Sequence, residues 1–102
     1  MIRFERSRQF KRHMKAEALQ YAKDAAVLAG TIDESARFQV FMGVFGSGER
    51  VFWIGDFEGL AALEKILMKI EADPRWQEFI VGAPRDLFVE GSGREAIMQL
   101  AP

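Results

Sequence analysis

The sequence predicts a single α+β domain whose elements follow the order strand–helix–strand–strand–helix–strand. Three observations lead to this prediction. The 102 residues, 49% of them hydrophobic and 28% charged, have the size and balance of one globular domain, over residues 1–102. Apolar residues recur with the two-residue period of strands in some segments and with the helical period in others. Turn-forming residues separate these segments, at Gly30, Gly46, Gly48 and Asp73-Pro74.

The first strand is expected over residues 2–10, with the first helix directly after it. Ile2, Phe4 and Phe10 share a period of two with polar residues between them. From residue 13 the period becomes helical, and one stripe holds Met14, Ala18, Tyr21, Ala22, Ala25 and Leu28. Gly30 follows the last turn and is predicted to end this helix, which leaves residues 31–37 as a polar loop.

Two β-rich runs, residues 38–45 and 50–55, flank the short segment that contains Gly46 and Gly48. Such a pattern predicts a β-hairpin. Asp56 is then predicted to cap a second helix, whose apolar stripe is Leu60, Leu63, Leu67 and Ile70.

The last third of the chain begins with Asp73-Pro74, which is predicted to start a short helix as N-cap and first helical residue. This helix is expected to stop near Gly82. Residues 84–93 leave two alternatives open, a further helical turn or a short strand at 87–89. Residues 96–100 are expected to form the last strand.

This order of elements predicts a ferredoxin-like antiparallel sheet with its helices on one face. The uncovered face should then alternate apolar with polar residues. In the hairpin it does not, because Val40 and Trp53 point to one face while Phe41 and Phe52 point to the other. A second copy of the chain is the simplest cover for the open face, so we expect a homodimer.

Composition excludes several classes of protein. The chain has no cysteine, which excludes disulfides, zinc ribbons and thiol catalysis and agrees with the cytoplasmic location that we expect. No apolar run approaches the roughly 20 residues of a membrane span, and the start lacks the apolar core of a signal peptide. We therefore expect no membrane partner.

The first fifteen residues are basic, with six Lys or Arg against the single acid Glu5, in a chain of net charge −1. Such an end indicates either a nucleic-acid or anion contact or a solvated surface that pairs with the acidic remainder. RNA-binding ferredoxin-like sheets carry exposed aromatics in a Lys/Arg-Gly-Phe-like strand, and residues 38–45 lack that pattern. We expect pairing within the chain and no nucleic-acid partner.

Five segments together resemble a known group of proteins: Ile2-Arg3-Phe4-Glu5-Arg6, Phe41-Met42-Gly43-Val44-Phe45-Gly46, Arg50-Val51-Phe52-Trp53-Ile54, Asp56-Phe57-Glu58-Gly59-Leu60-Ala61-Ala62-Leu63 and Ala72-Asp73-Pro74-Arg75-Trp76-Gln77. In these the chain is similar to the dimeric α/β-barrel superfamily, in particular its small NIPSNAP-like members. The resemblance implies two ferredoxin-like sheets packed face to face, helices outside, and a small pocket between sheet and helices. The superfamily spans several activities, so the resemblance does not select one.

The residue composition gives little support for a cofactor or a metal site. The chain contains no asparagine, so the Asn–Trp pairing that the resemblance associates with quinone-forming monooxygenases and haem-degrading enzymes cannot form. With one histidine and no cysteine, a transition-metal site would need a spaced carboxylate cluster, and none is present. We expect no metal and no cofactor, and the sequence leaves open whether the protein is an enzyme.

Arg6 and Arg8 are the first candidate site residues, because they lie on the same strand face as Ile2, Phe4 and Phe10. A cation on a covered face must be paired, since an unpaired buried charge is strongly unfavourable. These arginines would either bind the carboxylate or phosphate of a ligand or pair with an acid such as Asp56.

Three further candidates are His13, Tyr21 and Trp53. His13, where strand turns into helix, is either a group at the mouth of a pocket or a turn residue. Tyr21 on the buried helical stripe either orients a ligand or is a core tyrosine bonded to backbone. Trp53 either forms a wall for a flat ligand or packs in the core.

The function that these residues predict is a homodimeric α/β barrel that binds a small apolar or anionic ligand, with or without cofactor-independent chemistry. The alternative is a non-catalytic structural or interaction protein whose apolar sheet face serves only dimerisation.

Overall fold

The computed structural model describes residues 1–46 and 48–102, so that Ser47, in the predicted hairpin turn, lies outside the described residues. Within them, one antiparallel sheet has the strand order β2–β3–β1–β4. Its strands are β1 (Ile2–Gln9), β2 (Gln39–Met42), β3 (Arg50–Phe57) and β4 (Arg94–Gln99). The helices are the 3₁₀ turn η1 (Arg12–Met14), α1 (Lys15–Ile32), α2 (Leu60–Ala72) and α3 (Pro74–Val81).

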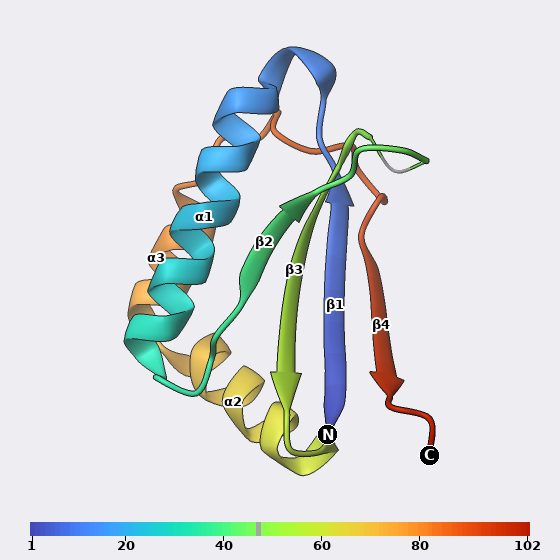
Figure 1. The fold of residues 1–102 in the computed structure, drawn as a ribbon. Helices are drawn as coiled ribbons and strands as arrows, with labels where there is room; N and C mark the ends of the chain where they lie inside the picture. The colour runs from blue at the N-terminus through green and yellow to red at the C-terminus, as the bar shows by residue number, and fades with distance from the viewer. Residues whose placement is uncertain (47) are drawn as a thin grey trace.

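The three α-helices cover one face of the sheet and leave the other open (Figure 1). The predicted α+β fold with a ferredoxin-like sheet is therefore confirmed. None of the helices in the described residues is long and apolar enough to cross a membrane.

Helix α1 extends past Gly30, so the predicted stop at this glycine is wrong. Among the described residues only Gly46 and Gly91 have the positive φ of a left-handed terminator. The helix continues because Ile32 is buried against the core, and it ends where the backbone N–H of Asp33 donates to the carbonyl of Ala29 at 3.0 Å.

The predicted cap of α2 by Asp56 is also wrong. Asp56 lies within β3 and pairs with Arg3 on β1, with Arg3 Nε 2.8 Å from Asp56 Oδ1. The N-cap position of α2 is Gly59, which has no side-chain cap. By contrast, the cap of α3 is confirmed, because Asp73 accepts a hydrogen bond from the backbone N–H of Arg75 at 2.8 Å.

Residues 84–93 form neither a helix nor a strand. They are an irregular segment that is joined to the end of β1 by an isolated bridge between Phe10 and Phe88. The N–H of Val89 donates to the carbonyl of Gln9 at 2.8 Å, and Leu87 is completely buried. The segment thus closes one end of the space under the helices.

The basic start of the chain is mostly paired with acids from later segments. Arg3 binds Asp56, Arg6 binds Glu95, Lys11 lies near Asp86, and Arg12 binds Glu49. This is the pairing expected of a solvated surface. It accounts for four of the six basic residues in the first fifteen.

The buried residues form two clusters at the two ends of β1. One contains Ile2, Phe4, Ala29, Ile32, Ala36, Phe57, Leu63, Ile66 and Ile70. The other contains Phe10, Ala18, Ala22, Val51, Leu87 and Phe88. Arg6 and Arg8 lie between Phe4 and Phe10 on the helix-facing side of β1, so the two cations separate the clusters.

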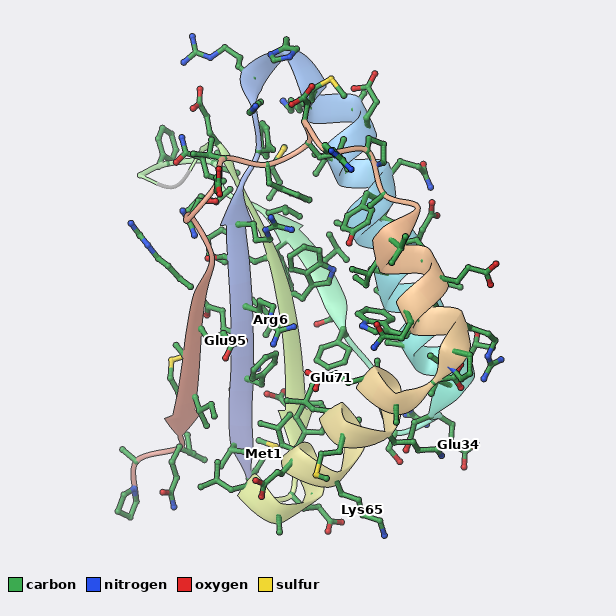
Figure 2. The ribbon with its side chains drawn as sticks, turned by 180° about the vertical axis from the view of Figure 1, so that it is seen from behind. Met1, Arg6, Glu34, Lys65, Glu71 and Glu95 are labelled. Atoms are coloured by element: carbon green, nitrogen blue, oxygen red, sulfur yellow. The ribbon has the colours of Figure 1, made fainter. Side chains whose placement is uncertain are left out.

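The open face of the sheet is partly apolar, as the alternation in the hairpin predicts. The register places Phe41, Phe52 and Ile54 on this face, with Ala96 and Met98 on the far edge. Phe41 is 48% exposed and Met98 is 44% exposed. Strand β4 lies away from the helices in both views, and all six of its residues are exposed (Figures 1 and 2).

Candidate functional site

A cavity of about 150 Å³ lies between the sheet and the helices, where the two buried clusters meet. Residues from β1, β3, the three α-helices and the position before β2 line it: Phe4, Arg6, Arg8, Tyr21, Ala25, Ala26, Ala29, Phe38, Trp53, Leu67, Ile70, Glu71, Trp76 and Ile80. The lining is mainly apolar, with a few polar groups that converge on it. This composition is typical of small-molecule sites.

The cavity exists because small residues of α1 face large polar ones of β1. Ala25, Ala26 and Ala29 project toward the sheet without enough side chain to fill the space there. On the opposite wall, Arg6 and Arg8 cannot pack as tightly as aliphatic residues, because their guanidinium groups need polar partners or solvent.

Aromatic rings form much of the wall. Phe4 and Phe38 meet edge to face with centroids 6.1 Å apart, and both tryptophans of the chain line the cavity. The Nε1–H of Trp53 donates to the carbonyl of Ala22 at 3.0 Å, which fixes the indole ring against α1. The ring of Trp76 packs against the larger buried cluster. The walls are therefore rigid and flat.

Arg6 is held by an acid on the neighbouring strand. Arg6 and Glu95 are direct partners in the register, and Arg6 Nε donates to Glu95 Oε1 at 2.8 Å, with a second contact from Arg6 Nη2 (Figure 2). The guanidinium also lies 5.4 Å from the ring centroid of Phe4. Of the two alternatives for Arg6, the structure thus shows the ion pair within the chain. The partner is Glu95, whereas Asp56 was the acid named as an example.

Arg8 has no such partner. No ion pair or hydrogen bond to its side chain occurs within the described part of the chain. Its guanidinium carbon lies 4.3 Å from the ring centroid of Phe88, which is a cation–π contact. The side chain is half-buried and lines the cavity, so its N–H donors remain available to a ligand there.

Tyr21 lies beside Arg8 in the same wall. Its ring stacks on Phe79, with centroids 5.0 Å apart, and meets Phe88 edge to face at 5.6 Å. In the residues that the structure describes, its hydroxyl has no hydrogen-bond partner. Burial raises the pKa of Tyr21, and the positive charge of Arg8 opposes that rise. The phenol is therefore neutral at physiological pH and can donate a hydrogen bond.

The structure thus brings Arg6, Arg8, Tyr21 and Trp53 together in one cavity, whereas His13 lies elsewhere. His13 is exposed in the turn η1 and does not line the cavity. Sequence reasoning missed Glu71 and Trp76, which complete the wall from α2 and α3. Periodicity could not reveal Trp76 as a wall residue, because its position depends on how α3 folds back after Asp73. Glu71 gave no signal because it is an exposed acid near the end of α2.

Arg50 was also missed, and it is the most buried charged residue described, at 8% exposed. It lies on the open face at the start of β3, where its Nη2 donates to the hydroxyl of Ser7 at 3.0 Å and also to the carbonyl of Ser92. Burial and the nearby charge of Arg94 lower its pKa. Neutral oxygens solvate this cation, so we interpret Arg50 as a structural link between β1, β3 and the segment before β4.

Metal ligands do not gather in this site. No group of three or more His, Asp or Glu residues within the described ranges could hold a metal ion. The polar groups of the cavity are instead two guanidinium groups, one phenol and one carboxylate, from Arg6, Arg8, Tyr21 and Glu71.

Comparison with known proteins shows which fold this is. No family profile matches the chain, and no curated protein matches it. Among solved structures, an uncharacterised NIPSNAP domain protein from Burkholderia xenovorans superposes with a TM-score of 0.80 at 18% identity, over 99% of this chain and 95% of the other. A NIPSNAP family protein of unknown function from Agrobacterium tumefaciens gives 0.78 at 19% identity, over 99% and 88%.

An antibiotic biosynthesis monooxygenase is similar to the chain as well, with a TM-score of 0.69 and 12% identity over 100% of both chains. The chain therefore has the fold of NIPSNAP-like proteins and of this monooxygenase. Identities this low show the fold and leave the activity open.

The position of Tyr21 near the charge of Arg8 predicts how the Tyr21 phenol titrates. Tyr21 is the only tyrosine, so near-ultraviolet phenolate absorbance reports it alone. We expect a pKa above the ordinary value of about 10 in the folded protein. The folded state holds the phenol proton more tightly than the unfolded state does. The contribution of this proton to the free energy of unfolding is therefore complete below pH of about 10 and is lost as pH rises through the pKa of the folded state.

Arg8→Gln should raise the pKa of Tyr21 further, because it removes the charge that favours the phenolate. Arg3→Gln, on the opposite face of the same strand, serves as the control and should leave it unchanged. An identical titration curve in wild type and Arg8→Gln would contradict the placement of these two groups.

Proposed function

We propose that this protein is a small-molecule-binding domain that holds a largely apolar ligand in the cavity between its sheet and its helices, and that it acts as a homodimer. The observation that carries the proposal is the convergence of Arg8 and the Tyr21 hydroxyl, both without protein partners in the described residues, on an aromatic-lined cavity. No fully buried side-chain nitrogen or oxygen among the described residues lacks a partner, so these two groups are reached by solvent and are available to a ligand. A few polar groups that converge on a mainly apolar cavity are typical of a small-molecule site.

The cavity volume limits what the ligand can be. About 150 Å³ is below the range of drug-sized pockets, and an apolar cavity of this order holds a single ring. No nucleophile with an adjacent base lines the cavity among the described residues. Binding is therefore the function that the geometry supports best.

The dimer is proposed from the open face of the sheet. Phe41, Phe52 and Ile54 form an apolar band on β2 and β3, and Val44 and Phe45, which follow β2 in the chain, are 76% and 94% exposed. Glu5 and Ser7 of β1 separate this band from Ala96 and Met98 on β4. An exposed apolar band that reaches the unpaired strand edge of β2 favours aggregation unless a partner covers it. Face-to-face packing of two sheets would bury this band without disturbing the helices.

The same band supports the second candidate function. If the open face serves only for dimerisation and the cavity binds nothing, the protein is a structural or interaction protein. The two candidates make opposite predictions about the cavity and agree about the dimer.

The cavity prediction is tested with the two indoles that line it. In ¹H–¹⁵N spectra, both indole N–H signals, from Trp53 and Trp76, should shift on titration with single-ring compounds, neutral or anionic. Ala26→Leu should abolish the shifts by filling the space, and should stabilise the fold by about 1 kcal/mol. Ala16→Leu, an exposed site on the same helix, is the matched control and should bind as wild type does.

Wild-type indole signals that stay fixed at millimolar concentrations of every compound would contradict the binding function. That result would leave the structural role as the function of the protein.

The dimer prediction is tested by sedimentation. Phe52→Asp places a charge at the centre of the apolar band and should convert a two-chain species into single chains. Val27→Asp, an equally drastic change at a 70% exposed site on α1, should leave the assembly intact. A wild-type protein that sediments as one chain at micromolar concentration, or a dimer unaffected by Phe52→Asp, would overturn the proposed interface.

A further inference from the structure

The cavity contains an uneven distribution of charge, and this distribution narrows the class of ligand. Arg6 is neutralised by Glu95, which accepts two of its N–H groups. Arg8 is not neutralised by any ion pair in the described residues. Glu71, which also lines the cavity, forms no ion pair with either arginine there. Among the described residues that line the cavity, Arg8 is therefore the cation without an ion pair, and Glu71 is the acid without one.

The Tyr21 hydroxyl supplies a second donor at the same place. Its stacking on Phe79 and its edge contact with Phe88 fix the phenol, and Phe88 also holds the guanidinium of Arg8. A guanidinium and a phenol that share one supporting ring are preorganised, so little conformational freedom is lost when both donate to the same acceptor. A carboxylate, with two acceptor oxygens, matches this pair of donors.

A phosphate fits the site less well. Near neutral pH a phosphate monoester carries close to two negative charges, whereas the cavity offers one cation without an ion pair. Glu71 repels any anion in the cavity, and this repulsion is stronger for a dianion than for a monoanion. The rest of the wall is formed by Phe4, Phe38, Trp53 and Trp76, which offer a flat apolar surface and no further free cation. The site is thus suited to a monoanion with an apolar, flat body.

From these observations, and resting on the proposed binding function, we infer that the ligand is a small aromatic monocarboxylate. Its carboxylate binds Arg8 and the Tyr21 hydroxyl, and its single ring lies between the aromatic walls. Arg6 stays with Glu95 and contributes to the wall.

The test compares benzoate with toluene, which has a similar size and shape and no charge, by tryptophan fluorescence and indole N–H shifts. Wild type should bind benzoate more tightly than toluene. Arg8→Met keeps the apolar stem over Phe88 and should weaken benzoate binding roughly 10- to 100-fold, the range for a charge-assisted hydrogen bond. It should leave toluene binding unchanged.

Tyr21→Phe should weaken benzoate binding about fivefold, as for one neutral hydrogen bond, again without effect on toluene. Arg3→Met removes the same charge from the opposite face of β1 and should bind both compounds as wild type does. If Arg8→Met were misfolded, Tyr21→Phe would still test the carboxylate assignment, since it removes a single oxygen atom.

The possible failures are distinguishable. Wild type that binds toluene but not benzoate, or benzoate binding that Arg8→Met leaves intact, would overturn the carboxylate assignment and keep the cavity as a binding site. Wild type that binds neither compound would overturn this inference, and the proposed function would fail with it only if every other single-ring compound also left the indole signals unchanged.

Discussion

The rest of the structure depends on one constraint, which is that two cations lie on the covered face of the central strand. Arg6 and Arg8 lie on the helix-facing side of β1, between Phe4 and Phe10, under the layer of helices. A guanidinium cannot be buried there without a partner, because the loss of hydration is too unfavourable. The two arginines are accommodated differently, one by the acid Glu95 on β4 and the other by an aromatic ring and an open cavity.

Several features of the molecule follow from this constraint. The buried clusters are separated where the arginines lie, and the helix above them carries alanines, so the space is not filled. Burial raises the pKa of Tyr21, beside Arg8, and the nearby positive charge opposes that rise. The same sheet exposes apolar residues on its other face. One face of the sheet thus borders a cavity, and the other carries exposed apolar residues.

The sequence predicted those elements of the fold that depend on patterns among neighbouring residues. The predictions were wrong where contacts with residues far away in the sequence determine the structure. The order of strands and helices and the Asp73 cap could be predicted from patterns a few residues long. Gly30 did not end α1, because the burial of Ile32 outweighs the preference of glycine for a terminus. The cap predicted at Asp56 was wrong because this residue pairs with Arg3, which is far away in the sequence, and no local pattern reveals such a contact.

The residues of the candidate site could be predicted in part from the sequence, but their pairing could not. Arg6, Arg8, Tyr21 and Trp53 were singled out because charged or polar-tipped residues on apolar faces are unusual. That Arg8 is the unpaired cation depends on Glu95, which approaches from β4. The most direct test of the account is a nuclear Overhauser measurement on the protein with benzoate. It predicts contacts from the benzoate ring protons to the indoles that line the cavity, whereas contacts confined to the open sheet face, or none, would contradict it.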